Sequence, residues 1–391
     1  MASAATLTTT DAQPAPNAGK RRLIFVDAIR GAMLVLMAVN HIPSDVQRVT
    51  NHPFGFVSAA EGFVFMSGLM SGWVYSKRYY RDGPAAMKDA ALRRALAVYL
   101  YHIVSFVAVL GTIAVLANVF GVYAIAASDP MLDHPWTMLA TGVVFLQQPA
   151  LFDILPMYCV FLVALPFVLT ACAKGHRTNV LFGSFMLWLL ANIFSPQQPI
   201  VHWPVDMGSF NLLAWQFIFV LGAVCGQAWT AGERIVPKVS AWTVTLALIP
   251  GVYFFLVRHA YVKPPVSGAW LDWMTNKNNV APFRLLDSLI HYYLIYALVS
   301  KFPRWFSWSS LALLGRHSIF VFSAHIAVAY FILSSPDTLQ ATAAERWFST
   351  FLMVGAMFAA AGFHSWIQEL QKSRRESLRS PVQASARHAE G

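Results

Sequence analysis

Three ionisable side chains interrupt an apolar stretch near the start of the chain, residues 26–42: Asp27, Arg30 and His41. An ionised group inside a membrane is costly, so such residues are functional candidates. Histidine has a pKa near neutrality and can act as a general base, whereas arginine binds anions. On one helix, Arg30 and His41 would lie about 16 Å apart on nearly the same face, so they could contact two ends of a long substrate. Asp27 is close enough in sequence to pair with Arg30.

Further polar residues recur at matching depths in later apolar segments. Arg316 is expected at the same inner level as Arg30, about 8 to 9 Å from the cytoplasmic end, so the two arginines suit an anionic group that enters from the cytoplasm. A lone carboxylate in lipid must pair or become protonated, which makes Glu61 a strong candidate. The outer half is expected to hold four candidates beside His41: Glu61, Asp287, His291 and His325.

Structural roles stay open for several of these residues. Arg30 and Asp27 could form only an ion pair, and Arg316 could extend to the inner interface along its aliphatic stem. His291 and His325 could be hydrogen-bonded bundle histidines without a chemical role. The sequence has no His-Glu-x-x-His pattern, phosphate-binding loop, dinucleotide fingerprint or Gly-x-Ser-x-Gly elbow, so we expect no metal site and no nucleotide cofactor of those kinds.

The elements that must position these residues are transmembrane helices. The chain of 391 residues is 57% hydrophobic and 12% charged, whereas soluble domains average about 25% charged residues. We therefore expect an all-α, polytopic membrane protein with about ten spans in one bundle. The predicted spans are residues 24–43, 54–75, 92–119, 153–173, 180–194, 210–229, 239–257, 285–301, 311–333 and 347–367. Segment 137–148 is too short to span and is expected to be interfacial or re-entrant.

Basic residues set the expected orientation. The net charge of +10 comes from lysines and arginines concentrated in alternate loops, which places both termini in the cytoplasm. The same charge could suggest nucleic acid, but no nucleic-acid motif accompanies it. We expect a disordered tail over 1–22, a membrane domain over 23–368 and a basic cytoplasmic tail over 369–391. Trp203, Trp270 and Trp273 in outer loops suit interfacial anchoring, although they could also stack on a sugar ring.

Several short motifs together resemble the OpgC family of the acyltransferase-3 superfamily. They are Asp27-x-x-Arg30-Gly31, then Asn40-His41-Ile42-Pro43, and then the segment from Ala60 through Glu61 to Gly68. Pro282-Phe283-Arg284 and Gly315-Arg316-His317-Ser318 follow later. Each motif is weak alone, but their order and spacing across residues 24–367 are fairly specific for the family. Gly62 departs from the larger apolar residue expected in the segment that holds Glu61.

The resemblance implies an acyltransferase of the bacterial inner membrane. Its donor would be a cytoplasmic acyl-CoA, succinyl-CoA or acetyl-CoA, and its acceptor a hydroxyl of an envelope or periplasmic glycan. If the phosphates of the donor bound near Arg30 and Arg316, its thioester would point toward His41. His41 would then act as general base. Glu61 would orient or compensate the imidazolium, and His325 or His291 would stabilise the oxyanion. Arg284 and Asp287 are assigned with Asp27 to substrate binding.

Other classes of function stay open. A transporter would line a proton or solute path with the same polar residues, and would produce flux without covalent change. A membrane scaffold or sensor would leave Glu61 and the histidines without chemistry. Within the acyltransferase hypothesis, an acyl-histidine intermediate is an alternative to direct transfer. The acyl group, the acceptor and the oligomeric state are not set by the sequence.

Overall fold

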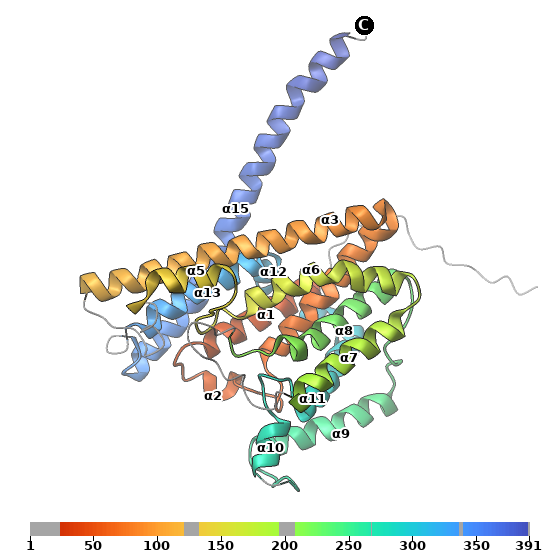
Figure 1. Cartoon of the computed structure of the whole chain (residues 1–391), viewed down its shortest axis with the longest axis vertical. Helices are drawn as coiled ribbons and strands as arrows, with labels where there is room; N and C mark the ends of the chain where they lie inside the picture. The colour runs from red at the N-terminus through yellow and green to blue at the C-terminus, as the bar shows by residue number, and fades with distance from the viewer. Residues whose placement is uncertain (1–23, 121–132, 195–207, 267, 336–338, 390–391) are drawn as a thin grey trace, which may run out of the picture.

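The computed structural model describes residues 24–120, 133–194, 208–266, 268–335 and 339–389, and their regular elements are all helices (Figure 1). The expected tail over 1–22 and Trp203 lie outside these ranges. The helices are α1 Ile24–Asn40, α2 Gln47–Thr50, α3 Ala59–Phe120, α5 Pro135–Val143, α6 Ile154–Ala173, α7 Arg177–Phe194, α8 Leu212–Thr230, α9 Ala241–Arg258, α10 Gly268–Met274, α11 Pro282–Lys301, η2 Pro303–Phe306, α12 Ser309–Arg316, α13 Ser318–Leu333 and α15 Ala343–Ala389.

The described helices include six that are long and apolar enough to cross a membrane, or seven if α12 and α13 form one broken span. This finding supports a multi-pass membrane protein and is lower than the expected ten. Each of the ten predicted spans overlaps a described helix, and three features explain the difference. Helix α1 has only 17 residues, α3 combines two predicted spans, and α11 is made more polar by Arg284, Asp287 and His291.

Helix α3 bends sharply where the sequence places Gly83 before Pro84. Gly83 adopts φ 88° and ψ 172°, a non-helical conformation that glycine reaches without steric cost. The bend separates a first arm, which enters the bundle, from a second arm that runs across it (Figure 1). The predicted spans 54–75 and 92–119 therefore lie on the two arms.

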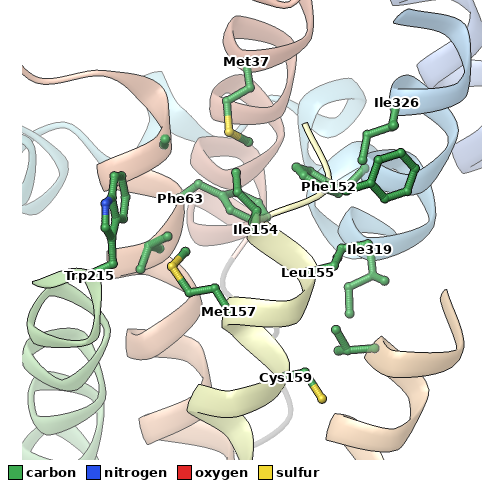
Figure 2. Close-up of a cluster of buried hydrophobic side chains, with 14 of the residues drawn as sticks. Met37, Phe63, Phe152, Ile154, Leu155, Met157, Cys159, Trp215, Ile319 and Ile326 are labelled. Atoms are coloured by element: carbon green, nitrogen blue, oxygen red, sulfur yellow. The ribbon is translucent and has the colours of Figure 1, made fainter. Parts of the chain in front are cut away.

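Close packing of glycines joins α3 to α8 within the core. A Cβ atom on Gly68 would lie 2.1 Å from the carbonyl oxygen of Phe219, and one on Gly222 would lie 2.3 Å from that of Phe65. Small residues at these positions let the two backbones approach, as at many membrane helix contacts. Phe63, Met157 and Trp215 belong to the same buried cluster, which joins α3, α6 and α8 (Figure 2).

Glycines also fix the contact between α1 and α12. A Cβ atom on Gly31 would lie 1.9 Å from the carbonyl oxygen of Leu311, and one on Gly315 would lie 1.8 Å from that of Asp27. The two motifs that carry Arg30 and Arg316 therefore meet because each has a glycine at the crossing. This backbone contact places Arg30 next to α12 and Arg316 next to α1.

Gly315→Ala should disrupt this crossing. The added methyl group requires the α1 and α12 backbones to move apart, so we expect the free energy of unfolding to fall by about 1–3 kcal/mol or more, measured by thermal unfolding of the purified protein. Gly355→Ala is the matched control, because nothing lies within 4 Å of its added Cβ atom and helical Gly→Ala is stabilising by roughly 0.5–1 kcal/mol. Equal unfolding temperatures of the two variants would refute a tight crossing.

Three further features complete the fold. Helices α12 and α13 meet at His317 with a bend of 87°, so Ser318 begins a new helix close to the Arg316 motif. Helix α5 has nine residues, too few to cross a bilayer, as expected for segment 137–148. Helix α15 continues from the last predicted span into the basic region 369–389 and projects away from the bundle (Figure 1).

Candidate functional site

Two histidines that are far apart in the sequence meet at the C-terminal end of α1. His41 follows the last residue of α1, and His325 lies on α13 and is buried. The Nδ1 atom of His41 is 3.0 Å from the Nε2 atom of His325, and the rings stack with centroids 5.2 Å apart. The structure therefore brings together two of the four residues predicted to be catalytic.

The surroundings of the pair favour one proton arrangement. The backbone carbonyls of Val321 and Phe322 lie near the His325 ring and can only accept a hydrogen bond. The buried Nδ1 atom of His325 makes no hydrogen bond of normal geometry among the described residues, so these carbonyls are its nearest acceptors for a proton. With its proton on Nδ1, the Nε2 atom of His325 is the acceptor for His41 Nδ1–H. The lone pair of His41 is then on Nε2, the ring nitrogen that faces away from His325. This tautomer makes His41 the member of the pair that can accept a proton.

A narrow, mostly apolar cavity lies between Arg30 and the aromatic ring that packs on the histidine pair. Arg30, Ser318, Phe63 and Phe322 are among the residues that line it. Phe322 packs edge-on against the ring of His325, with centroids 4.8 Å apart, and stacks on Phe63 at 6.3 Å. One aromatic ring therefore separates the cavity from the histidine pair.

The inner end of the site is built from the α1 and α12 motifs. Arg30 Nη2 donates a hydrogen bond of 2.6 Å to the hydroxyl oxygen of Ser318, the first residue of α13. Arg316 Nε lies 4.0 Å from the Oδ2 atom of buried Asp27, and the Arg316 side chain is 36% exposed. The structure thus places the expected cationic residues on neighbouring helices, with Arg316 still open to the surface.

Glu61 lies in a different set of contacts from the one expected. Its Oε1 atom is ion-paired with Arg284 of α11, and its Oε2 atom accepts from the Ser58 backbone N–H at 2.9 Å and from the Ser58 hydroxyl at 2.5 Å. Both oxygens are occupied, so the expected direct contact between Glu61 and His41 is not present. A fully buried carboxylate needs a cation, and α11 supplies Arg284 for this purpose.

His52 completes this ion pair and was not predicted. Its Nε2 atom lies 2.9 Å from Arg284 Nη2, and because arginine can only donate, His52 must be the neutral acceptor. Burial, followed by the Arg284 charge, lowers the pKa of His52 from 6.5 to about 4. A loop histidine before a proline carries no local signal that it will be buried against an arginine 232 positions away.

The His52 shift predicts a pH-dependent stability. Between about pH 6.5 and about pH 4 the unfolded chain takes up a proton at His52 that the folded chain does not, so lowering the pH through this range favours unfolding. We expect His52→Gln, which keeps an acceptor for Arg284, to lose less stability than wild type between pH 7 and pH 4.5. Thermal unfolding across this range measures the difference, and identical pH profiles would contradict the assignment.

Asp287 and His291 form a third group, on α11. Asp287 Oδ2 accepts from the backbone N–H groups of Phe56 and Val57 at 2.7 and 3.1 Å. His291 Nδ1 lies 3.0 Å from Asp287 Oδ1 and 2.8 Å from its backbone oxygen. These contacts fasten the segment before α3 to α11, so Asp287 serves the protein backbone. His291 Nδ1 is engaged by Asp287, and no contact between His291 and His41 is present among the described residues.

Lys277 is a second residue that the sequence reasoning missed. It lies in the loop before α11 and interacts electrostatically with His41, His52 and Glu61. Burial lowers its pKa, and the Glu61 carboxylate opposes this effect. Among the residues that the structure describes, no group of three or more His, Cys, Asp or Glu side chains could hold a metal ion.

Two of the tryptophans considered from the sequence lie together on α10. Trp270 and Trp273 of α10 pack edge to face with centroids 5.7 Å apart, and Trp270 is largely exposed. This arrangement leaves both earlier interpretations, interfacial anchoring and ring stacking, in place.

Comparison with known proteins gives one match. A family model described as "OpgC protein" matches residues 22–369, which covers most of the chain and all the residues of the candidate site. No curated protein and no solved structure matches the chain significantly.

Proposed function

The chain belongs to the OpgC family, and from this premise we propose that it is an integral-membrane O-acyltransferase that moves an acyl group from a cytoplasmic acyl-CoA to a hydroxyl group of a periplasmic glucan. The observation that carries the proposal is the His41–His325 hydrogen bond of 3.0 Å. This bond holds the imidazole of His41 against His325. The Phe322 ring packs on His325 and also lines the cavity that contains Arg30. Such an arrangement suits proton transfer at a reaction between two bound substrates.

In the proposed mechanism, His41 Nε2 removes the proton of the glucan hydroxyl while its oxygen attacks the thioester carbonyl carbon. The resulting tetrahedral intermediate collapses with cleavage of the carbon–sulfur bond, and the imidazolium returns the proton to the departing thiolate. His325 accepts the hydrogen bond from His41 Nδ1–H throughout, which holds the ring and its tautomer. Attack by His41 itself, with an acyl-histidine intermediate, is the competing route.

The donor would enter from the inner side. Arg316, partly exposed, and Arg30, which lines the cavity, are positioned on neighbouring helices for the phosphates of the donor. Arginine suits this role because its planar guanidinium forms bidentate hydrogen bonds with phosphate. The apolar lining of the cavity suits the uncharged arm that links the phosphates to the thioester. Succinyl and acetyl groups are both compatible with this arrangement.

The topology follows from the same proposal. We place ten spans in the bacterial inner membrane with both termini in the cytoplasm, so that Arg30 and Arg316 face the donor compartment and His41 faces the periplasm. This count treats the broken pair α12–α13 as one span and the two arms of α3 as two spans. The concentration of basic residues in alternate loops supports the orientation.

Mass spectrometry of envelope glycans tests the proposal. A deletion strain should lack one acyl mass increment on its periplasmic glucan, and the wild-type gene should restore it. Loss of uptake of a solute in the deletion strain, with every glycan mass unchanged, would instead support a transporter. An acyl adduct trapped on His41 after rapid quenching would favour the acyl-histidine route.

A further inference from the structure

The loop over residues 275–281 is held by hydrogen bonds from several helices. Its backbone oxygens accept from side chains of α7, α8 and α11, and from the backbone at the start of α8. The contacts are Trp188 Nε1 to Val280 O at 2.9 Å, Asn192 Nδ2 to Asn279 O at 3.0 Å, Trp215 Nε1 to Asn278 O at 3.0 Å, Asn211 N to Asn278 O at 2.9 Å and Arg284 Nη1 to Thr275 O at 3.4 Å. A connecting loop with so many fixed points is rigid.

The same loop holds a strained residue. Val280 is fully buried and has φ 44°, a conformation that is unfavourable for a β-branched side chain. Strain of this kind persists only where the surrounding contacts impose it, and it is concentrated at functional sites. The loop therefore fixes the direction of the side chains that it carries.

Lys277 is the charged side chain of this loop. Its Nζ atom lies 5.4 Å from the centroid of the Phe210 ring, and it is within electrostatic range of His41 and Glu61. Among the described residues, no hydrogen bond and no ion pair within 4.0 Å occupies its ammonium group. Among the described residues, its three N–H donors are therefore not used in hydrogen bonds, and the charge acts on His41.

Among the described residues, no carboxylate lies within 4.0 Å of the Lys277 ammonium group. The Glu61 carboxylate is paired with Arg284 and bonded to Ser58, and His52 is neutral as the acceptor of Arg284. Asp153 is the other acid in range, and its Oδ2 atom accepts from Ser209 N–H at 3.1 Å. A mostly buried ammonium without a close anion is unfavourable in the free protein, and a bound anionic oxygen would compensate it.

The other oxyanion donors considered from the sequence are engaged elsewhere. His325 Nε2 is bonded to His41, and His291 Nδ1 is bonded to Asp287. Lys277 is a charged side chain in electrostatic range of His41 whose donors make no hydrogen bond among the described residues. It is also carried by a rigid loop, as a preorganised charge for catalysis requires.

We propose that Lys277 binds a negatively charged oxygen of the acyl substrate beside His41. This proposal rests on the acyltransferase function proposed above. The oxygen has two possible sources: the thioester carbonyl oxygen as it becomes an oxyanion, or a carboxylate at the far end of a dicarboxylic acyl group. Both use the same ammonium–oxyanion chemistry.

The test is glucan acylation by the purified full-length protein, with acetyl-CoA and with succinyl-CoA as donors. Lys277→Met should lower kcat by roughly 100-fold or more, whereas Lys277→Arg should retain part of the activity. Lys263→Met, in an exposed outer loop, is the matched control and should be unchanged. A loss with both donors assigns Lys277 to the reacting oxygen, and a loss confined to succinyl-CoA assigns it to the distal carboxylate.

Thermal unfolding supplies a readout that a structural lysine would not give. Removal of an unpaired buried charge should raise the unfolding temperature of Lys277→Met while its activity falls. Unchanged activity with both donors, or a lower unfolding temperature that accounts for the loss, would overturn the role of Lys277. Wild-type protein that transfers neither acyl group would refute the acyltransferase function instead.

Discussion

Replacing His41 by alanine should lower acyl transfer by roughly 10²–10⁴-fold, the usual contribution of a general base. Without this imidazole, no base takes the proton of the attacking hydroxyl, although the cavity and its arginine remain. The variant should keep its cellular abundance, because His41 is only partly buried and ends its helix. Initial rates of glucan acylation in membranes measure the effect.

His259→Ala is the matched control for this prediction. His259 is an exposed histidine at the end of α9, so its loss should leave the rate unchanged. His325→Ala should lower the rate less than His41→Ala, because His325 orients the base and does not take the substrate proton. Full activity of His41→Ala at normal abundance would remove His41 from the mechanism.

The second large effect is expected on stability. Glu61→Gln leaves the Arg284 guanidinium buried without its anion, and breaking a buried ion pair in this way costs about 3–5 kcal/mol. The cost should be visible as a marked fall in unfolding temperature and in folded yield. Glu233→Gln is the control, because Glu233 is exposed in its ion pair with Arg177 and Arg177 keeps its hydrogen bonds to Gln227, so the loss should have little effect.

The double variant Glu61→Gln/Arg284→Met separates a buried pair from two independent contacts. The double variant lacks the Arg284 charge that Glu61→Gln leaves buried without an anion. It should therefore be more stable than Glu61→Gln alone. Additive losses from the two substitutions would contradict the coupling that the structure gives to Glu61 and Arg284.

The sequence predicted features that depend on residues close together in the chain. Gly31 follows Arg30 and Gly315 precedes Arg316, and the structure uses these glycines to bring the two motifs together. The helical, multi-pass character followed from composition and apolar length. The family resemblance is confirmed by the match over residues 22–369.

Contacts between side chains on helices far apart in the sequence could not be predicted from local spacing. His41 and His325 are 284 positions apart, and Glu61 and Arg284 are 223 apart. Depth placed His41, His325 and Glu61 at one level, but the partner of each depends on how the helices are rotated. Glu61 was therefore assigned to His41, whereas its actual cation is Arg284.

Loop residues were missed for a related reason. Periodicity identifies buried faces of helices, but it says nothing about a lysine or a histidine that a loop directs inward. His52 and Lys277 became visible only through their partners. The number of spans was also less certain than their positions, because α1 is short and α12–α13 is broken.

The central claim is that an acyl group passes from a donor on one side of the membrane to a hydroxyl on the other, at His41. Proteoliposomes that contain the full-length protein, with glucan trapped inside and ¹³C-labelled acyl-CoA added outside, test it most directly. The account predicts labelled ester on the trapped glucan with wild-type protein and background label with His41→Ala. Labelled glucan at equal levels with both proteins, or none with wild type, would contradict it.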